Sequence, residues 1–536
     1  MFDWLQKVGQ RGGHPMLNVA DATRLLEQLP RDDPLKATEE VTAWLESLAR
    51  ATRFGSGHRL RVVSMVDEAG QPGAEALMAE YLAGESSQKA DRFRRWQVLM
   101  NFWEKLADAY TEIVGYFEIS QKSEPREQMP LVTVRAMRAV FMQMRLALMR
   151  YAGEPDRTWG ALYRLFSFAA NQRWTTTPVR LYPSGSHTTT PRHELVSAVM
   201  LEAAAPQTLP PRQIELTSRL AARLASAFAF SDAPGERLYF CVDLAKAAPP
   251  TMIPRGLQAA PTMRFFGPGT VASRLNEIIE RNRNPQPSAP EDSFGAGYTA
   301  ADRLETLQRL LAYWGDNPPR RKHARTRLAA RVDVVFGLET IMQVVGKLDQ
   351  VIATDKFEIL FDDERAADGK PARAVFETWT LKDISLRGLG ATSSRRAQGL
   401  RIGALMAFRL ENTDNWCVGI VRRMQSDRQK NSEIGAEIVS KHPRLFWLGK
   451  PGSPHDDAWN WETRREDATS HHYLKTVLLP FDKETADEES LLVEPGSYLP
   501  GEPYTAQIEK QARHLRFSKV LEPGERFERV AFRWLD

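Results

Sequence analysis

The first 230 residues show the hydrophobic spacing of amphipathic helices. Val41, Trp44 and Leu48 repeat at helical intervals after Asp33 and Pro34, a capping residue followed by proline at the first helical position. Apolar residues at the same spacing predict further helices over residues 90–117, 131–151, 159–174, 194–204 and 212–230. The N-terminal region is therefore predicted to be helical, with its aromatic residues in the core.

The spacing changes beyond a helix predicted over residues 301–314. Short apolar segments bounded by turn residues there predict strands over residues 376–381, 405–410, 417–421, 434–439, 474–479, 490–493, 504–508, 515–520 and 530–534. The isolated apolar segment 238–242 is either one strand or a buried helix end. Because the helices precede the strands and do not alternate with them, we predict separate α and β domains in a multidomain α + β protein.

The length of the chain and the composition of one segment predict how the chain divides into domains. Its 536 residues are enough for roughly two to four domains. Residues 281–293 are polar and rich in proline, which is typical of a linker. The predicted parts are a helical domain over residues 1–280, a linker over 281–300, a β-rich domain with a lead-in helix over 301–448, and a small β-rich domain over 449–536.

Composition excludes several classes of protein. Subtracting 68 acidic from 72 basic residues leaves a net charge of +4, which excludes a generally cationic nucleic-acid coat protein, and we expect no DNA partner. The two cysteines, Cys241 and Cys417, exclude a disulfide framework and indicate a reducing compartment. No apolar run approaches the roughly 18 residues of a membrane helix. The first 14 residues also lack the apolar core of a secretory signal, so a cytoplasmic protein without membrane insertion is predicted.

No catalytic constellation emerges from the chain. It holds no Gly-x-Ser-x-Gly elbow, no Walker loop and no cysteine paired with a histidine as in a nucleophile. One group of residues has metal-ligand chemistry: His455, Asp456, Asp457, His471 and His472. They lie among Gly, Pro, Ser and Asn without the i, i+4 spacing of a metalloprotease, which favours a solvated loop. We predict no enzymatic activity, and a metal enzyme built on this loop is the weakest alternative.

Two polar motifs stand out in the C-terminal half. Residues 320–327, Arg-Arg-Lys-His-Ala-Arg-Thr-Arg, are the densest basic stretch of the chain and contain no acid. Alone, such a stretch is typical of a solvated turn. Residues 383–390, Asp-Ile-Ser-Leu-Arg-Gly-Leu-Gly, follow the strand predicted to end at Leu381. Local turn bonds are the structural alternative for Asp383 and Ser385.

In this order the two motifs resemble the signature of the PilZ domain, Arg-x-x-x-Arg followed by Asp/Asn-x-Ser-x-x-Gly. The matching residues are Arg320 (the extra arginine that many members carry), Arg321, Arg325, Asp383, Ser385 and Gly388. The predicted strands downstream, with Gly403 before them, also fit the family. The resemblance covers residues 318–445, about a quarter of the chain.

This resemblance implies that residues 301–448 form an antiparallel β-barrel and that the six matching residues bind cyclic di-GMP, a bacterial second messenger, without a cofactor. A guanidinium bonds the O6 and N7 atoms of guanine, stacks on the base or pairs with phosphate. Asp383 would accept from the guanine N1–H and N2–H₂ groups, and Ser385 would bond the same base or its own turn. Gly388 would allow a close approach or a positive φ. Trp379 and Trp416 are expected in the barrel core.

One departure from the family lies between the two motifs. The interval from Arg325 to Asp383 is 383 − 325 = 58 residues, longer than the family's usual few tens. The excess is assigned to an insertion near residues 338–373. An insertion that covered the ligand face would weaken or abolish binding.

The sequence thus predicts a cyclic di-GMP receptor and effector that relays ligand occupancy to an unidentified protein partner through the helical N-terminal domain. The alternative is an interaction scaffold whose degenerate barrel does not bind the ligand. The intact motif favours the receptor, and the long insertion favours the scaffold.

Overall fold

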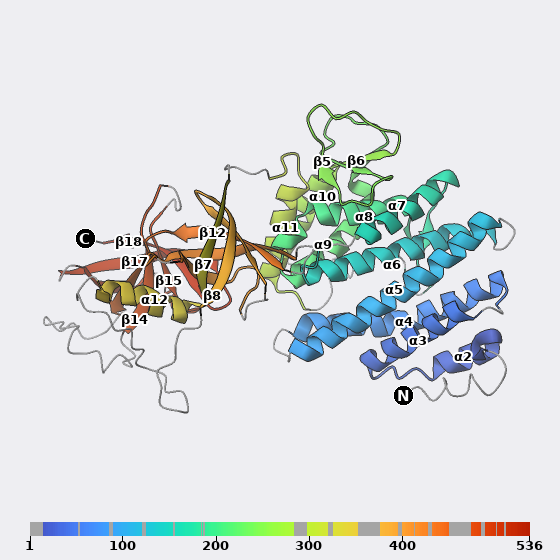
Figure 1. Cartoon of the computed structure of the whole chain (residues 1–536), viewed down its shortest axis with the longest axis horizontal. Coiled ribbons are helices and arrows are strands. Elements are labelled where there is room, and N and C mark those ends of the chain that lie inside the picture. The colour runs from blue at the N-terminus through green and yellow to red at the C-terminus, as the bar shows by residue number, and fades with distance from the viewer. Residues whose placement is uncertain are drawn as a thin grey trace. The chain divides into compact units, whose positions relative to one another are not determined.

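The computed structural model divides into two compact units, Met1–Arg320 and Arg321–Asp536 (Figure 1). The first unit is mainly helical and the second is built mainly from strands, which confirms the predicted multidomain α + β class. The structure describes residues 14–51, 54–84, 89–120, 125–153, 156–183, 185, 188–283, 297–319, 325–351, 376–394, 399–411, 413–426, 431–449, 473–483, 488–499, 501–508 and 511–535.

Long α-helices make up most of the first unit. They are α2 (Val19–Glu27), α3 (Pro34–Arg50), α4 (Ser56–Ala83), α5 (Lys89–Ile119), α6 (Met129–Met149), α7 (Asp156–Asn171), α8 (Pro191–Ala203), α9 (Pro211–Arg223), α10 (Val271–Arg283) and α11 (Ala300–Tyr313). The α3 helix begins as predicted, because the Asp33 side chain accepts from the Lys36 N–H at 3.0 Å. The ends of α5, α6, α7 and α8 lie within three residues of the predicted ones.

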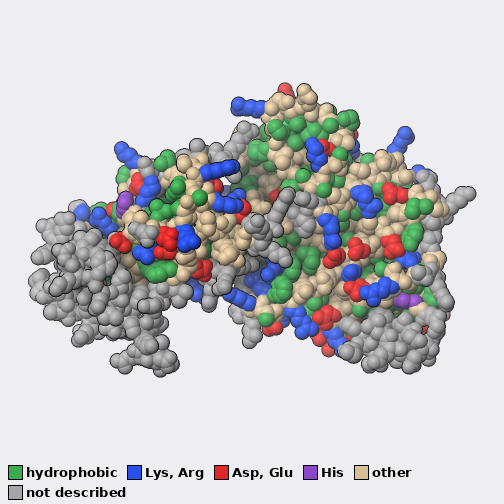
Figure 2. All heavy atoms as spheres, in the orientation of Figure 1, with side chains coloured by type: hydrophobic (Ala, Val, Ile, Leu, Met, Phe, Trp, Pro, Cys, Tyr) green, Lys and Arg blue, Asp and Glu red, His purple; other side chains and the backbone are tan. Residues whose placement is uncertain are grey.

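The α6 helix lies at the centre of this unit. Of its 21 residues, 18 are buried, and it packs against α5, α7, α8 and α9. Apolar residues lie on every side of this helix, and its buried Arg135, Gln143 and Arg145 have partners on neighbouring elements, so other helices must enclose it. On the face of the helical unit that Figure 2 shows, acidic and basic side chains are intermingled.

A small antiparallel sheet completes the helical unit. Its strands, in spatial order, are β3 (Ala229–Ser231), β6 (Met263–Gly267), β4 (Phe240–Asp243) and β5 (Thr251–Met252). The segment 238–242 therefore contributes a strand and not a helix end. The helix predicted over residues 212–230 ends early, because residues 229–231 leave it to pair with β6. A two-stranded hairpin, β1 (Val179–Arg180) and β2 (Thr188–Thr189), lies between α7 and α8.

The lead-in helix α11 packs within the helical unit. Leu307, Leu310 and Trp314 are buried in the same apolar core as α9, and the Trp314 Nε1–H donates to the Met200 carbonyl at 2.8 Å. The predicted boundary at residue 301 would separate α11 from these partners. Amphipathic spacing reveals an apolar face but does not reveal which domain covers it. Residues 284–293 of the predicted linker lie outside the described residues, while α10 extends to Arg283.

Two closed antiparallel barrels form the second unit. The first consists of β7 (Thr326–Phe336), β8 (Glu377–Ser385), β9 (Gly388–Ser393), β10 (Leu405–Leu410), β11 (Cys417–Ser426) and β12 (Ser432–Ser440). The second consists of β13 (Arg444–Gly449), β14 (Tyr473–Leu479), β15 (Ser490–Val493), β16 (Pro503–Ile508), β17 (Gln511–Pro523) and β18 (Glu528–Trp534). Both barrels have the same spatial strand order. If the six strands of each barrel are numbered along the chain, the order around the barrel is 1-2-3-6-5-4, and strand 4 pairs with strand 1 to close it.

The predicted strands lie within these barrels, but three strands escaped the sequence analysis: β7, β9 and β13. The small C-terminal β domain is thus a complete six-stranded barrel that begins at Arg444, before the predicted boundary at residue 449. The repeat of one topology was also missed, because the two barrels do not share a sequence repeat of fixed period.

The segment assigned to an insertion begins with helix α12 (Leu338–Val351). This helix packs against β7 and β10 of the first barrel and against β13 and β14 of the second. Ile341 and Val345 of α12 share one apolar cluster with Val418 of the first barrel and Leu492 of the second. Residues 338–351 therefore join the two barrels, whereas residues 352–373 lie outside the described residues. Among the described helices, none is long and apolar enough to span a membrane.

Candidate ligand-binding site

The β8–β9 hairpin carries the second half of the signature. Its turn, Leu386 and Arg387, is two residues long, and Ser385 and Gly388 form the last pair of the ladder. The Ser385 hydroxyl donates to the Gly388 carbonyl at 3.4 Å. A Cβ on Gly388 would lie 3.2 Å from the Ser385 Oγ, and the φ of this glycine is not positive. A side chain at position 388 would therefore crowd the Ser385 hydroxyl, which agrees with the predicted close approach, and the alternative of a positive φ is wrong.

Asp383 is aimed outward by an irregularity in its strand. The β8–β9 register shifts between Leu381 and Asp383, and a bulge of this kind re-aims the side chain that follows it. The Asp383 carboxylate then lies over Gly390, where an added Cβ would come within 2.5 Å of its Oδ1. Sequence reasoning missed Gly390, although a second glycine two residues after Gly388 is visible in the sequence.

Arg325 meets Asp383 across the barrel seam between β7 and β8. Its Nη1 lies 2.8 Å from the Asp383 Oδ1, and the two side chains are 30% and 26% exposed. A partly exposed pair of this kind contributes only about 0–1 kcal/mol to stability. A phosphate or a guanine can therefore take over either partner at little cost. Arg327, opposite Asp383 in the β7–β8 register and exposed, adds positive charge to the same edge.

The structure thus brings together Arg325, Asp383, Ser385 and Gly388, four of the six predicted site residues. Arg320 and Arg321 lie outside the described residues. The local turn bond predicted as an alternative is present at Ser385, whereas Asp383 bonds an arginine from another strand. The site is therefore assembled by tertiary contacts.

The two signature-region tryptophans are core residues, as predicted. Trp379 is 1% exposed and Trp416 is 4% exposed, so neither presents a ring to a ligand. Trp416 stacks on Phe376 at 5.8 Å between centroids, and the Arg409 guanidinium lies 5.0 Å from the centre of its ring. If a guanine base of a ligand stacks on this barrel, it must stack on side chains other than Trp379 and Trp416.

The equivalent hairpin of the second barrel has different chemistry. Between its closing pair, Leu479 and Ser490, lie residues 480–489, which include five acids and one lysine. Only residues 441–443 separate β12 from β13, so no arginine-rich segment precedes the second barrel. An anion with two phosphates would be repelled by this acidic loop. The candidate anion site belongs to the first barrel.

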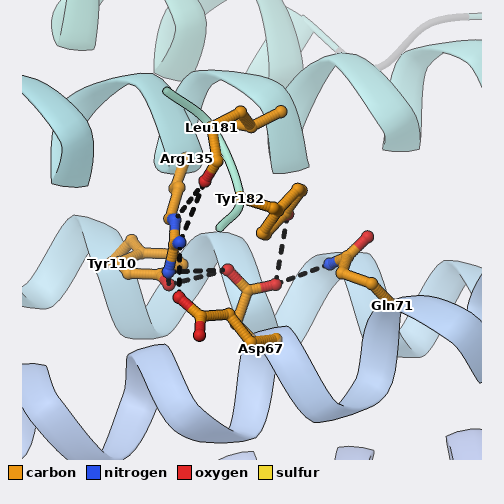
Figure 3. Close-up of polar contacts among 7 residues, drawn as sticks. Asp67, Gln71, Tyr110, Arg135, Leu181 and Tyr182 are labelled. Atoms are coloured by element: carbon orange, nitrogen blue, oxygen red, sulfur yellow. Dashed lines mark hydrogen bonds and ion pairs between the residues drawn. The ribbon is translucent and has the colours of Figure 1, made fainter. Parts of the chain in front are cut away.

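A second cluster of polar residues lies inside the helical unit (Figure 3). The fully buried Asp67 carboxylate of α4 accepts from the Tyr110 hydroxyl at 2.7 Å, from the Gln71 amide at 2.5 Å and from the Tyr182 hydroxyl at 3.2 Å. The Arg135 Nη1 of α6 lies 3.5 Å from the same carboxylate. These residues, labelled in Figure 3, come from α4, α5, α6 and the β1–β2 loop.

Arg135 completes this cluster. Its guanidinium donates to the Leu181 carbonyl at 2.9 Å, to Glu68 at 2.7 Å and to the Tyr110 oxygen at 3.1 Å. Burial raises the pKa of Asp67, while Arg135 and the hydroxyl donors oppose that rise. Burial also raises the pKa of Tyr110, so its phenol stays protonated. The cluster is filled by its own members, and its role is to hold α4, α5, α6 and the β1–β2 loop together.

Metal chemistry finds no support in the described parts of the chain, where no three His, Cys, Asp or Glu side chains cluster as ligands. The histidine-rich loop of residues 455–472 lies outside those parts. The metal-enzyme alternative therefore gains no observation in its favour.

Residues 20–235 match the family model described as "Cyclic-di-GMP receptor FimW, N-terminal domain". The matched segment runs from α2 to just beyond β3, so it lies within the helical unit and spans less than half of the chain. The residue pattern of this helical region carries no motif from which a family was predicted. The match gives no information about the barrels, and their likeness to PilZ stays a prediction. A comparison with curated proteins finds no match.

Among solved structures, one similar chain is described as "MrkH, A novel c-di-GMP dependence transcription regulatory factor". The identity is 6% and the TM-score 0.13, over 40% of this chain and 87% of that chain. A TM-score of this size does not establish a shared fold. That chain is described as a transcription regulator, and our expectation that DNA is not a partner of this chain is withdrawn. That expectation rested on the net charge of +4, and a sum over the whole chain says nothing about where its cations lie.

Proposed function

We propose that this chain is a non-enzymatic receptor for cyclic di-GMP and that the ligand binds at the β8–β9 hairpin of a PilZ-like first barrel. The observation that carries the proposal is the meeting of Arg325, Asp383, Ser385 and Gly388 at one hairpin. The family match of residues 20–235, whose description names a cyclic di-GMP receptor, supports it from a separate part of the chain.

The chemistry of this hairpin suits the ligand. The Asp383 carboxylate accepts hydrogen bonds only, and the Watson–Crick edge of guanine offers N1–H and N2–H₂ donors. When a base takes Asp383, Arg325 is released from its 2.8 Å bond and becomes available to a phosphate or to guanine O6 and N7. Gly388 leaves the hairpin backbone open to close approach. Ligand binding then exchanges the one charge-assisted bond between Arg325 and Asp383 for separate charge-assisted bonds from each of the two residues to the ligand.

Signal transfer is the second part of the proposal. Arg325 precedes β7, whose far end leads into α12 and so to the cluster shared by both barrels. Arg422 of β11 bonds Glu437 of β12 at 2.8 Å and Glu522 of the second barrel at 2.8 Å. Glu437 lies opposite Gly388 in the β9–β12 register. Ligand occupancy at the hairpin therefore has a route through packed residues to the second barrel. The further relay to a protein partner through the helical unit is a proposal for which these contacts supply no route.

Calorimetric titration of the full chain tests the receptor. We expect cyclic di-GMP to bind more tightly than GTP, and Arg325→Ala to lose about one to two decades of affinity, the value of a charge-assisted hydrogen bond. The matched control is Arg331→Ala, on the strand β7 that Arg325 precedes; the Arg331 side chain is 68% exposed and pairs with Glu411. Equal competition by GTP and cyclic di-GMP would refute the proposal.

The second candidate function is an interaction scaffold with a non-binding barrel. The observation that favours it is the Arg325–Asp383 bond itself, because two signature residues already satisfy each other. A scaffold would show no heat on titration with cyclic di-GMP and would keep its partner binding in the Arg325→Ala variant. A receptor would release or absorb heat on titration with cyclic di-GMP, and its Arg325→Ala variant would lose the ligand-dependent partner binding.

A further inference from the structure

Two histidines hold the N-terminal edge of the helical unit. The short 3₁₀ helix η1 (Pro15–Leu17) leads into α2, and its central residue, Met16, is 1% exposed. The Met16 N–H donates to the His14 Nδ1 at 3.1 Å, and the Met16 carbonyl accepts from the His58 Nε2 at 3.1 Å. Both polar backbone groups of a buried residue therefore depend on imidazole rings, one of which comes from a position 42 residues away along the chain.

The ring of Phe54 lies between the two imidazoles. The His58 ring stacks on it with 5.3 Å between centroids and 14° between planes, and the His14 ring meets it edge-on at 5.3 Å and 73°. Phe54 itself is buried. The three rings thus join the start of η1 to the connection between α3 and α4.

The hydrogen bonds around His14 determine where its protons lie. The Ser47 hydroxyl of α3 donates to the Trp44 carbonyl at 2.8 Å, because a carbonyl can only accept. The Ser47 oxygen therefore accepts from the His14 Nε2, 2.8 Å away. The other ring nitrogen, Nδ1, accepts from a backbone N–H and must carry no proton. His14 fits this site only as a neutral imidazole with its proton on Nε2.

A second proton on His14 has no acceptor here. Protonation of Nδ1 would set one N–H group against the Met16 N–H and would leave that buried donor unpaired, which is costly. His58 differs, because its Nε2 donates to a carbonyl whether its ring is neutral or charged. Burial lowers the pKa of His14, in agreement with this geometry. His14 is therefore the proton-sensitive member of the pair.

The charged residues of the neighbouring helices offer little compensation for a cation at this place. In the described parts of α2 to α5, ion pairs join Asp21 to Arg24, Glu46 to Lys105, and Arg59 to Glu112. The Arg59 guanidinium lies 6.0 Å from the centre of the Phe54 ring, and Arg50 is exposed in the last turn of α3. These two arginines would repel a charged His14.

Few buried side chains hold the segment in place. Together η1 and α2 bury Met16, Ala22 and Leu26. The α2 helix has nine residues, fewer than the roughly 12–15 that an isolated helix needs even to be marginally stable in water. Segments with so few buried apolar contacts open at a lower free energy than the whole domain. Loss of the His14 contacts should therefore release this segment before the core helices unfold.

We propose that His14 is a pH switch: when its imidazole takes up a second proton, residues 14–27 detach from α3 and α4 while the other helices stay folded. In the detached segment His14 binds a proton near its usual pKa of about 6.5, and in the attached segment it binds the proton less tightly. The segment is therefore held at neutral pH, and its attachment weakens as the pH falls below about 6.5. This inference does not depend on cyclic di-GMP binding.

Hydrogen–deuterium exchange of the full chain, followed by mass spectrometry, tests the switch. Peptides covering residues 14–27 are compared at about pH 7.5 and about pH 5.5, after correction for the pH dependence of the chemical exchange rate. Their opening equilibrium should rise by up to about tenfold at the lower pH, because opening is linked to one proton on a group of pKa about 6.5. Peptides from α6 should stay protected at both values.

His14→Asn separates titration from capping. An asparagine oxygen can cap η1 as Asn18 caps α2, but it does not titrate, so this variant should lose the pH dependence whatever its protection at pH 7.5. The matched control is His442→Asn, exposed in the second unit, which should keep the pH dependence of the parent. Equal protection of the parent at both pH values, or a parent-like pH dependence in His14→Asn, overturns the proposal. Loss of the dependence in His58→Gln but not in His14→Asn overturns it too, because the switch would then be His58.

Discussion

Two aspartate–arginine pairs in this chain have opposite surroundings. In the helical unit, the side chains of Asp67 and Arg135 are 0% and 3% exposed. In the first barrel, those of Asp383 and Arg325 are 26% and 30% exposed. The buried pair is surrounded by tyrosine, glutamine and backbone partners, and its loss would leave a charge without solvent. The half-exposed pair lies at the edge of a hairpin, where a ligand can replace either member.

The comparison shows that residue types alone do not distinguish a structural ion pair from a binding site. Burial and the number of surrounding donors decide the role. A carboxylate that already accepts from two tyrosines and an amide, as Asp67 does, has little capacity left for a ligand. Asp383 lies at the surface over a glycine, where its oxygens remain accessible to another molecule.

The largest expected effect is the loss of stability when the buried Asp67–Arg135 pair is broken. Arg135→Ala should lower the free energy of unfolding of the helical unit by about 3–5 kcal/mol, because Asp67 would be left as an unpaired buried charge. Urea denaturation followed by far-ultraviolet circular dichroism measures this loss. Arg94→Ala is the matched control, since Arg94 is 62% exposed and pairs with Glu39 at the surface. A loss as small as in the control would mean that the cluster is not structural.

Glu202 extends the comparison, because among the described residues its buried carboxylate forms no ion pair with an arginine, unlike that of Asp67. The Oε2 of Glu202 is buried and has no hydrogen-bond partner in the described structure, and burial raises the pKa of Glu202 to about 7. The folded state therefore holds this proton more tightly than the unfolded state, whose pKa is near the usual glutamate value of about 4.3. Stability should fall as the pH rises through this window, with the contribution lost above about pH 7.

Glu202→Gln should flatten this pH dependence and should stabilise the chain at pH 8, by at most about 4 kcal/mol. Thermal melts of parent and variant between pH 4 and pH 8, spaced to cover the window, provide the measurement. Parallel curves for the two proteins would show that Glu202 does not titrate differently in the folded state.

Salt should separate the exposed pair from the buried one. Affinity for cyclic di-GMP should weaken several-fold as the ionic strength rises from about 0.05 to 0.5 M, because attraction between arginine and phosphate is screened at the surface. The stability contribution of Arg135, enclosed in the helical core, should change much less over the same range. Titrations and urea melts at both salt concentrations make the comparison, and equal responses would contradict it.

The smallest expected effect is on the stability of the barrel. Arg325→Ala should change the unfolding free energy of the full chain by less than about 1 kcal/mol, because it breaks only a partly exposed ion pair. The same variant should lose most of its affinity for cyclic di-GMP. A large loss of stability would make Arg325 a structural residue and would remove the contrast with Arg135.

Much of the fold could be predicted from local sequence. The spacing after Asp33 predicted α3 with its cap, and short apolar segments bounded by turn residues predicted β10 and β15 with their observed ends. The missed strands have local reasons. The pairing of β7 with β8 shifts between Arg327 and Ala330, which interrupts its alternation, and β9 begins Gly-Leu-Gly, a sequence with little preference for strands.

The candidate site was predictable only in part. The spacing of Arg325, Asp383, Ser385 and Gly388 belongs to the sequence, and their meeting at one hairpin follows from the pairing of β7, β8 and β9.

The sequence by itself determined the helical and β-rich halves, most element positions and the chemistry of the signature residues, because periodicity, capping and turn propensity act between near neighbours. Only the tertiary structure showed that two six-stranded barrels close with the same strand order and that α12 joins them. It also showed that the Arg135 side chain is buried, whereas that of Arg325 is partly exposed. These outcomes depend on contacts between distant residues, whose burial sets whether a charge stabilises the fold or remains available to a ligand.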